Sequence, residues 1–382
     1  MIAMNGSLRS ALVGGTALVL SGFLANAAQH YQPVNLITDN QAANPAPLGD
    51  GSLLNAWGIS FSATSPFWVS DNGAGVSTVY SVNPTTDVPT KVNRTVAIPP
   101  VGPPPQGTPT GQAFNSLAAS GAFNGDAFLF VSEDGTISGW RNALGSTAEI
   151  LQSPLSDNIY KGATMTSISG HGYLLAANFK AGTIDVLKGD SGAPDLTGKF
   201  TDPNLPAGYA PFNIRDLGDK LFVTYALQGL NGDDAPGAGH GIVDEFDLQG
   251  NLIGRVGSQG GTLNSPWGLE IAPASFGPLA GDLLVGNFGD GTINAFNLTS
   301  HSFDGQLQSP SGPLMIDGLW GLTVGNDGSA GSSDKLYFTA GPNDESHGLF
   351  GLVRGVPDGG SSLLLLGMAG AALGTWSRRA KL

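Results

Sequence analysis

The sequence predicts an all-β fold, a six-bladed β-propeller, and three observations carry this prediction. One phrase recurs six times between Trp57 and Val353: an aromatic–Gly or aromatic–Asn opening, a buried apolar run, and a strand introduced by a glycine. The repeat period of about 40–60 residues, with several short strands in each copy, is typical of propeller blades. The chain also has 58 Gly among 382 residues but only 12% charged residues, as expected for an all-β chain with many turns.

The glycines before the third strands set the period. Their successive spacings are 60, 47, 59, 50 and 57 residues, and their positions are Gly75, Gly135, Gly182, Gly241, Gly291 and Gly348. Tight hairpin turns need positive φ, which glycine adopts without strain. We therefore expect left-handed backbone at all six positions.

Most copies also contain a fourth, outer strand. We expect such strands at Lys91–Ile98, Ala148–Leu151, Leu252–Val256 and Ser302–Leu307, with a weaker signal near Lys199–Thr201. The sixth copy has no residues left for its outer strand, and we expect Pro33–Thr38 to supply it. The ring would then be closed by an N-terminal strand, which removes an exposed sheet edge.

Composition excludes several classes of function. There is no cysteine, so disulfides, thiol nucleophiles and cysteine-based metal sites are excluded. The net charge of −14 leaves no basic surface that could neutralise phosphates, so we expect no nucleic-acid partner.

Two terminal segments are expected to lie outside the propeller, which would span residues 29–355. Residues 1–28 have the pattern of a secretory signal peptide, with Arg9, an apolar stretch and a small-residue cleavage site. Residues 356–382 form a tail in which an apolar stretch is just long enough for a transmembrane helix. The cations that follow this stretch would stay on the cytoplasmic side of a membrane.

This tail resembles the PEP-CTERM class of bacterial sorting signals, in its variant that begins Val-Pro-Asp. The matching residues flank the hydrophobic span on both sides: Val356, Pro357, Asp358, Arg378 and Arg379. The resemblance implies a Gram-negative bacterium, an exosortase-type sorting protease as a partner, and association with extracellular polysaccharide, envelope proteins or the outer cell surface. The repeat region is similar to an uncharacterised family of secreted bacterial propellers, through residues 56–59, 177–186 and 266–269. That similarity implies no established activity.

An aromatic set occupies one equivalent position at the start of the repeats: Trp57, Phe114, Lys161, Phe212, Trp267 and Trp320. Aromatic rings arranged around a channel can stack on the apolar faces of sugars, so this set predicts a ligand-binding face. The alternative interpretation is packing between blades. Lys161 breaks the aromatic pattern, and packing does not explain it.

An oxygen-rich set follows the second strands: Asp71-Asn72, Glu133-Asp134, Asn178, Asn287 and Asn343-Asp344-Glu345. From this set and the long loop 229–240 we take Asn72, Asp134, Asn178, Asp233 and Asn287 as candidate ligands for Ca²⁺, which prefers 6–8 oxygen ligands. Gluconolactonase-like propellers place a catalytic divalent metal in such a location. The alternative interpretation is that these residues form turns beside glycine.

No catalytic constellation is evident, because the five histidines lie in different loops and no nucleophile motif precedes a helix. We therefore predict an exported propeller on the cell surface or in the extracellular matrix that acts as a binding module rather than an enzyme. Two alternatives stay open: a metal-dependent hydrolase or lactonase, and a purely structural matrix component.

Overall fold

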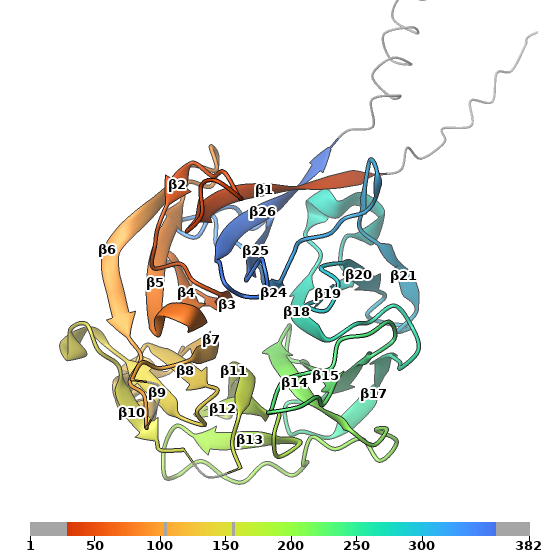
Figure 1. Cartoon of the computed structure of the whole chain (residues 1–382). Helices are drawn as coiled ribbons and strands as arrows, with labels where there is room; N and C mark the ends of the chain where they lie inside the picture. Colours follow the sequence, from red (N-terminus) through yellow and green to blue (C-terminus); the bar gives the residue numbers. More distant parts are fainter. Residues whose placement is uncertain (1–28, 103–104, 155–156, 357–382) are drawn as a thin grey trace, which may run out of the picture. The chain divides into compact units, whose positions relative to one another are not determined.

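The computed structural model describes residues 29–102, 105–154 and 157–356, and within them six small antiparallel sheets surround one axis (Figure 1). The first blade contains β3 (Ala56–Ser60), β4 (Phe67–Asp71), β5 (Val76–Val82) and β6 (Pro89–Ala97). The second blade contains β7 (Pro109–Phe114), β8 (Phe128–Ser132), β9 (Ile137–Trp140) and β10 (Glu149–Gln152). The third blade contains β11 (Tyr160–Ile168), β12 (His171–Asn178) and β13 (Thr183–Lys188). The fourth blade contains β14 (Tyr209–Asp216), β15 (Leu221–Leu227), β16 (Gly241–Phe246) and β17 (Leu252–Gly257). The fifth blade contains β18 (Pro266–Ile271), β19 (Leu283–Asn287), β20 (Ile293–Phe296) and β21 (Phe303–Gln306). The sixth blade contains β24 (Leu319–Val324), β25 (Leu336–Ala340), β26 (Leu349–Val356) and β1 (His30–Thr38).

The prediction of an all-β six-bladed propeller is confirmed. Short accessory elements complete the described chain: β2 (Leu48–Gly49), β22 (Gln308–Ser309), β23 (Gly312–Pro313), and the 3₁₀ turns η1 (Asn72–Ala74), η2 (Ala118–Ser120), η3 (Ala122–Gly125), η4 (Asn142–Leu144) and η5 (Ala274–Leu279). The described ranges contain no α-helix.

The third blade has three strands, so the prediction of an outer strand near Lys199–Thr201 is wrong. The amides of Gly198 and Phe200 donate instead to the carbonyls of Gln249 and Gly250, in the turn between β16 and β17. The segment is therefore tied to the fourth blade and is not available to extend the third.

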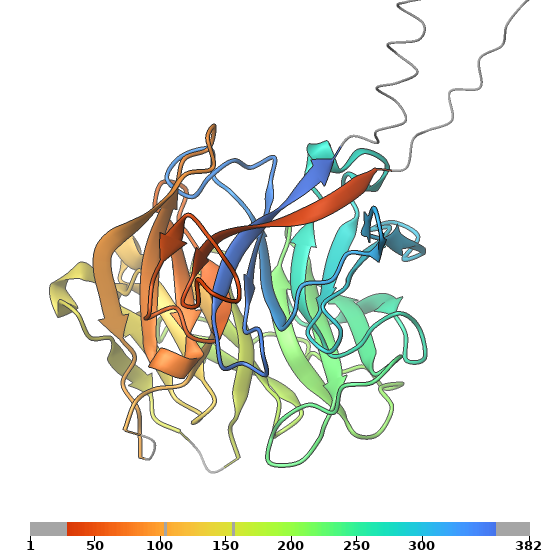
Figure 2. The same ribbon diagram turned by 45° about the horizontal axis from the view of Figure 1, so that its top comes forward.

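β1 lies beside β26 as the outer strand of the sixth blade (Figure 2). The antiparallel register runs from His30 opposite Val356 to Thr38 opposite Leu349, with one irregularity between Asn35 and Ile37. Leu36 and Ile37 are buried among side chains of β4, β5 and β26, so this N-terminal strand shares the core between the first and sixth blades.

The inner strands approach one another so closely that glycine is required beside the channel. A Cβ atom on Gly111 of β7 would lie 2.4 Å from the backbone nitrogen of Ala163 on β11. A Cβ on Gly58 of β3 would lie 2.4 Å from the carbonyl oxygen of Thr110. No side chain fits at such distances, and this close contact narrows the channel.

The glycines before the third strands do not all serve the same purpose. Gly75, Gly135, Gly182 and Gly291 have positive φ, as predicted. Gly241 and Gly348 are absent from the left-handed set, so the prediction is wrong for both. Close packing explains these two glycines, because a Cβ would lie 2.5 Å from Leu263 Cβ at Gly241 and 2.0 Å from the Leu53 carbonyl oxygen at Gly348.

The predicted signal peptide (1–28) and most of the predicted tail, with Pro357, Asp358, Arg378 and Arg379, lie outside the described residues. Val356, expected to begin the tail, is the last residue of β26. Among the residues that the structure describes, none belongs to a helix long and apolar enough to cross a membrane.

Candidate functional site

Every inner strand has an irregularity in its register near its first residues, and this defines one level of the channel. The residues there are Trp57, Thr110, Lys161, Phe212, Trp267 and Trp320. Five of them are predicted members of the ligand-binding set. Thr110 replaces the sixth predicted member, Phe114.

The structure corrects the position predicted for Phe114 in the alignment of the repeats. It is the last residue of β7, and its ring centroid lies 5.6 Å from that of Phe128, toward the opposite end of the channel. Both Pro109-Thr110-Gly111 and Phe114-Asn115 resemble the openings of other repeats. The first pattern is the correct one, because the register irregularity of β7 lies between Pro109 and Gln112, as that of β18 lies between Pro266 and Gly268.

An aromatic plug fills the channel at this level. Its members are Trp57, Phe179, Phe212, Trp267 and Trp320, with Phe288 packed at the edge. Trp320 stacks on Trp57 with ring centroids 3.7 Å apart and on Phe288 at 3.9 Å. The tryptophans are at most 5% exposed, so the expected aromatic face is mainly a packed core.

The indole N–H groups of the plug also have partners inside the protein. Trp57 and Trp320 both donate to Oδ1 of Asn55, at 2.8 and 3.1 Å, and Trp267 donates to the carbonyl oxygen of Lys161 at 2.9 Å. These donors are therefore not available to a ligand in this arrangement.

Lys161 is the exception within the set, because it carries its charge into the buried layer. Its side chain is 4% exposed, and its Nζ lies 2.5 Å from Oε1 of Glu133 and 3.2 Å from Oδ1 of Asp233. The ammonium also lies 5.3 Å from the ring centroid of Trp57, a favourable cation–π position. Burial alone would lower the pKa of Lys161, but the two carboxylates outweigh it and raise the pKa above its ordinary value. Lys161 is therefore a permanent cation rather than a nucleophile.

Hydrogen bonds extend from Lys161 around the channel opening. Nδ2 of Asn72 donates to Glu133 at 3.0 Å, and Nδ2 of Asn55 donates to Glu345 at 3.1 Å and to Asn72 at 3.5 Å. We call this connected set the Lys161 mouth; its members are Asn55, Asn72, Glu133, Lys161, Asp233 and Glu345. It draws on the first, second, third, fourth and sixth blades.

The backbone of the Lys161 mouth is held in an uncommon conformation. Asn55 has φ of 47°, and the consecutive residues Asn343, Asp344 and Glu345 have φ of 58°, 50° and 61°. Left-handed backbone costs about 1–2 kcal/mol for a residue with a side chain. Such conformations are concentrated at functional sites, because the surrounding structure must maintain them.

The mouth offers more hydrogen-bond acceptors than donors. Glu133, Asp233 and Glu345 carry three carboxylates against the single cation of Lys161. Burial raises the pKa of Glu345, and donation from Asn55 only partly offsets this effect. A ligand that presents O–H or N–H groups would complement the site.

Three of the candidate metal ligands make their hydrogen bonds outside the Lys161 mouth. Asn178 donates to Asn158 and Asp185, and Asn287 donates to Asp290 and Thr292 in its own blade. The carboxylate of Asp134 accepts from the amides of Val101 and Thr136. Only Asn72 and Asp233, of the five candidates, belong to the Lys161 mouth.

Sequence reasoning chose Asp134 where the structure places its neighbour Glu133 at the mouth. Glu345 belongs to the predicted oxygen-rich set but not to the five candidate ligands, and Asn55 belongs to neither. Within the described ranges, no three or more His, Asp or Glu side chains form a group suited to holding a metal ion.

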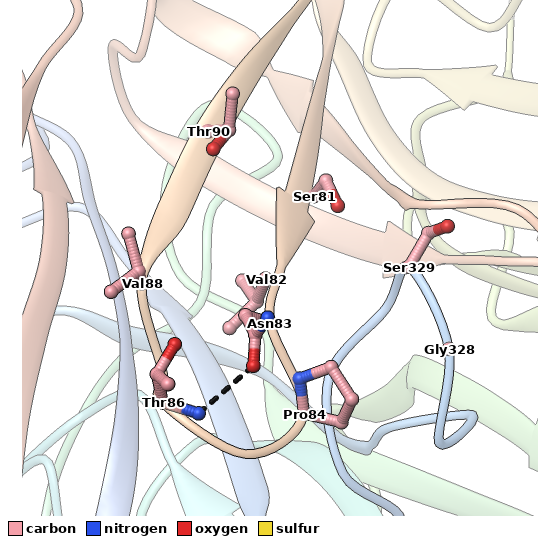
Figure 3. Close-up of a pocket in the computed structure, with 9 residues that line it drawn as sticks. All are labelled: Ser81, Val82, Asn83, Pro84, Thr86, Val88, Thr90, Gly328 and Ser329. Atoms are coloured by element: carbon pink, nitrogen blue, oxygen red, sulfur yellow. Dashed lines mark hydrogen bonds between the residues drawn. The ribbon is translucent and has the colours of Figure 1, made fainter.

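A cavity of about 650 Å³ lies away from the axis, between the β5–β6 hairpin and the loop around Gly328 (Figure 3). Its walls carry no charged side chain, and Asn83 Oδ1 is already occupied by the amides of Thr85 and Thr86. The Lys161 mouth is therefore the stronger candidate site.

Comparison with known proteins identifies relatives but no activity. No profile of a known protein family matches the chain. "Uncharacterized protein R648" of Acanthamoeba polyphaga mimivirus is 29% identical over 84% of this chain and 79% of its own length. "Uncharacterized protein L690" of the same virus is 30% identical over 79% of this chain and 80% of its own length.

These relatives correct the predicted family. They are viral proteins, so the expected bacterial PEP-CTERM family is wrong. Among solved structures, a streptogramin B lyase has 14% sequence identity and a TM-score of 0.44, with 86% of this chain and 98% of that chain covered. A likeness at that TM-score adds nothing to the assignment.

Proposed function

The chain belongs to the same protein family as L690 of Acanthamoeba polyphaga mimivirus, and we propose that it is a binding module whose Lys161 mouth holds a ligand rich in hydroxyl or amino groups. One observation carries the proposal: side chains of five blades form a connected polar network at the channel opening, and two of its members have left-handed backbone.

The charge of the site narrows the ligand class. With three carboxylates and one ammonium, the mouth would repel acidic polymers and attract neutral or amine-bearing ones. We propose an extracellular polysaccharide with neutral or amino sugars as the ligand, and export of the chain, directed by residues 1–28, to the cell surface or matrix where such a polymer occurs.

A glycan array probed with the purified chain tests this function. We expect binding to neutral or amino polysaccharides and none to sulfated or uronic-acid polymers. An array without any bound glycan would contradict the proposal and favour a structural matrix role.

The alternative function, a cation-dependent hydrolase, shares the same mouth, since Glu133 and Asp233 are carboxylates near solvent. The residues fit a divalent ion poorly, because the ammonium of Lys161 already lies between these two groups. Elemental analysis and melting with added Ca²⁺ separate the two functions. Stoichiometric bound metal would favour the hydrolase, and a melting temperature insensitive to Ca²⁺ would favour the binding module.

A further inference from the structure

A second cavity lies at the other end of the channel, where the inner strands end. It has a volume of about 190 Å³ and is lined by residues from all six blades, among them Phe61, Phe114, Thr164, Met165, Arg215 and Glu270. We call it the Arg215 pocket. None of its residues belongs to the Lys161 mouth.

The two ends of the channel are separate sites. Between them lies a cavity of about 10 Å³ beside Gln112, Asn213 and Trp267, which has room for one water molecule at most. The aromatic plug closes the remainder of the channel. A ligand in the Arg215 pocket would therefore not reach the Lys161 mouth.

Arg215 is the only cation that lines the pocket, and neighbouring groups fix its position. Its guanidinium donates to Oε2 of Glu270 at 3.1 Å and to the carbonyl oxygen of Leu322 at 3.3 Å. These contacts use two of its five N–H groups, and within the described chain no other acceptor takes the remaining three. The side chain is 24% exposed and lines the cavity.

The carboxylate beside Arg215 is already satisfied. Glu270 is 5% exposed and also accepts from the backbone amides of Ile271 and Val324, at 2.8 and 3.2 Å. It therefore holds the guanidinium in place and needs no ligand of its own. A second acid, Asp216, also lines the pocket, and burial raises its pKa.

The remaining wall combines polar side chains (Ser60, Gln112, Thr164 and Thr323) with apolar ones, and the size of the cavity limits what it can hold. Phe61, Phe114 and Met165 are half-buried at the rim. A cavity of about 150 Å³ is known to accept benzene, so this pocket suits a ligand with about one ring. A planar guanidinium recognises a carboxylate by two parallel hydrogen bonds.

We propose that the Arg215 pocket binds a small organic carboxylate with an apolar body, its carboxylate on Arg215 and its body against Phe61, Phe114 and Met165. The site is independent of the binding function proposed for the Lys161 mouth.

Isothermal titration of the full chain with benzoate tests this site, with benzyl alcohol and inorganic phosphate as parallel probes. We expect benzoate to bind, Arg215→Gln to weaken it by about tenfold or more, and benzyl alcohol to bind much more weakly. Arg94→Gln removes the same charge from a residue that packs on Trp140 outside the pocket, and it should leave benzoate binding unchanged.

A second variant tests the pocket even if Arg215→Gln fails to fold. Met165→Trp should fill the pocket and abolish benzoate binding while the Arg215–Glu270 pair remains intact. Three results would each overturn the proposal: no benzoate binding, equal affinity in the two pocket variants and the wild type, or phosphate binding in preference to benzoate.

Discussion

Lys161 governs the electrostatics of the mouth, because it is the single buried cation beside Glu133 and Asp233. Removing one partner of a buried ion pair leaves the other charge uncompensated. We expect Lys161→Met to lower the free energy of unfolding by about 2 kcal/mol. This loss is smaller than for a fully buried ion pair, because both carboxylates remain partly exposed. Asp233→Asn, which removes the more exposed partner, should cost less. Urea unfolding measures both changes, and equal stability of Lys161→Met and the wild type would contradict the role of this ion pair.

Asp71 makes stability depend on pH. It is fully buried, accepts a hydrogen bond from Thr78 at 2.7 Å, and burial raises its pKa well above the ordinary value of 3.8. The folded state therefore prefers the protonated form, and the stability it contributes is lost as pH rises through the raised pKa.

We expect Asp71→Asn to gain stability relative to the wild type as pH increases above the ordinary aspartate value of 3.8. Scanning calorimetry at several pH values measures the difference between the two melting temperatures. A difference that does not change with pH would show that Asp71 is not buried as a neutral acid.

Some residues of the Lys161 mouth were predictable from the sequence, but the hydrogen bonds that connect them were not. Lys161 was identifiable because it interrupts an aromatic pattern, and Asn72 and Asp233 because they are oxygen-rich loop residues. The contact between Asn55 and Glu345 joins residues 290 positions apart and depends on the sign of φ at both. Neither the residue types nor their spacing contain that information.

At the level of single elements, inner strands depend on glycine for close approach. Gly111→Ala should destabilise the protein by several kcal/mol, because the new methyl group would meet the backbone of β11 at 2.4 Å. Gly51→Ala is the matched control, since nothing lies within 4 Å of a Cβ there. Thermal denaturation compares the two variants, and a similar melting temperature for both would contradict the close packing of β7 against β11.

The strands of the blades were predictable because each carries a local signal: an apolar run, a turn residue and a fixed spacing. The level of each residue in the channel was harder to predict. In the second copy, Thr110-Gly111 and Phe114-Asn115 fit the repeat equally well by residue type. The backbone contact of Gly111 with β11 separates them, and that contact is tertiary.

For the whole molecule, the pairing of β1 with β26 links the two ends of the ring. Deleting residues 29–40 would expose the edge of β26 and remove Tyr31, Leu36 and Ile37 from the core. We expect a sharp fall in melting temperature by calorimetry. Replacing the exposed loop 41–46 with Gly and Ser is the control, and equal melting of the deletion and the control would contradict closure by β1.

Comparison of glycan-array profiles for the wild type, Glu345→Gln and Asp195→Asn tests the role of the Lys161 mouth most directly. Asp195 is an exposed acid outside the mouth, and its substitution removes the same charge. We predict that Glu345→Gln loses the neutral and amino glycans bound by the wild type, whereas Asp195→Asn retains them. Identical profiles for all three proteins would contradict the assignment of the mouth as the binding site.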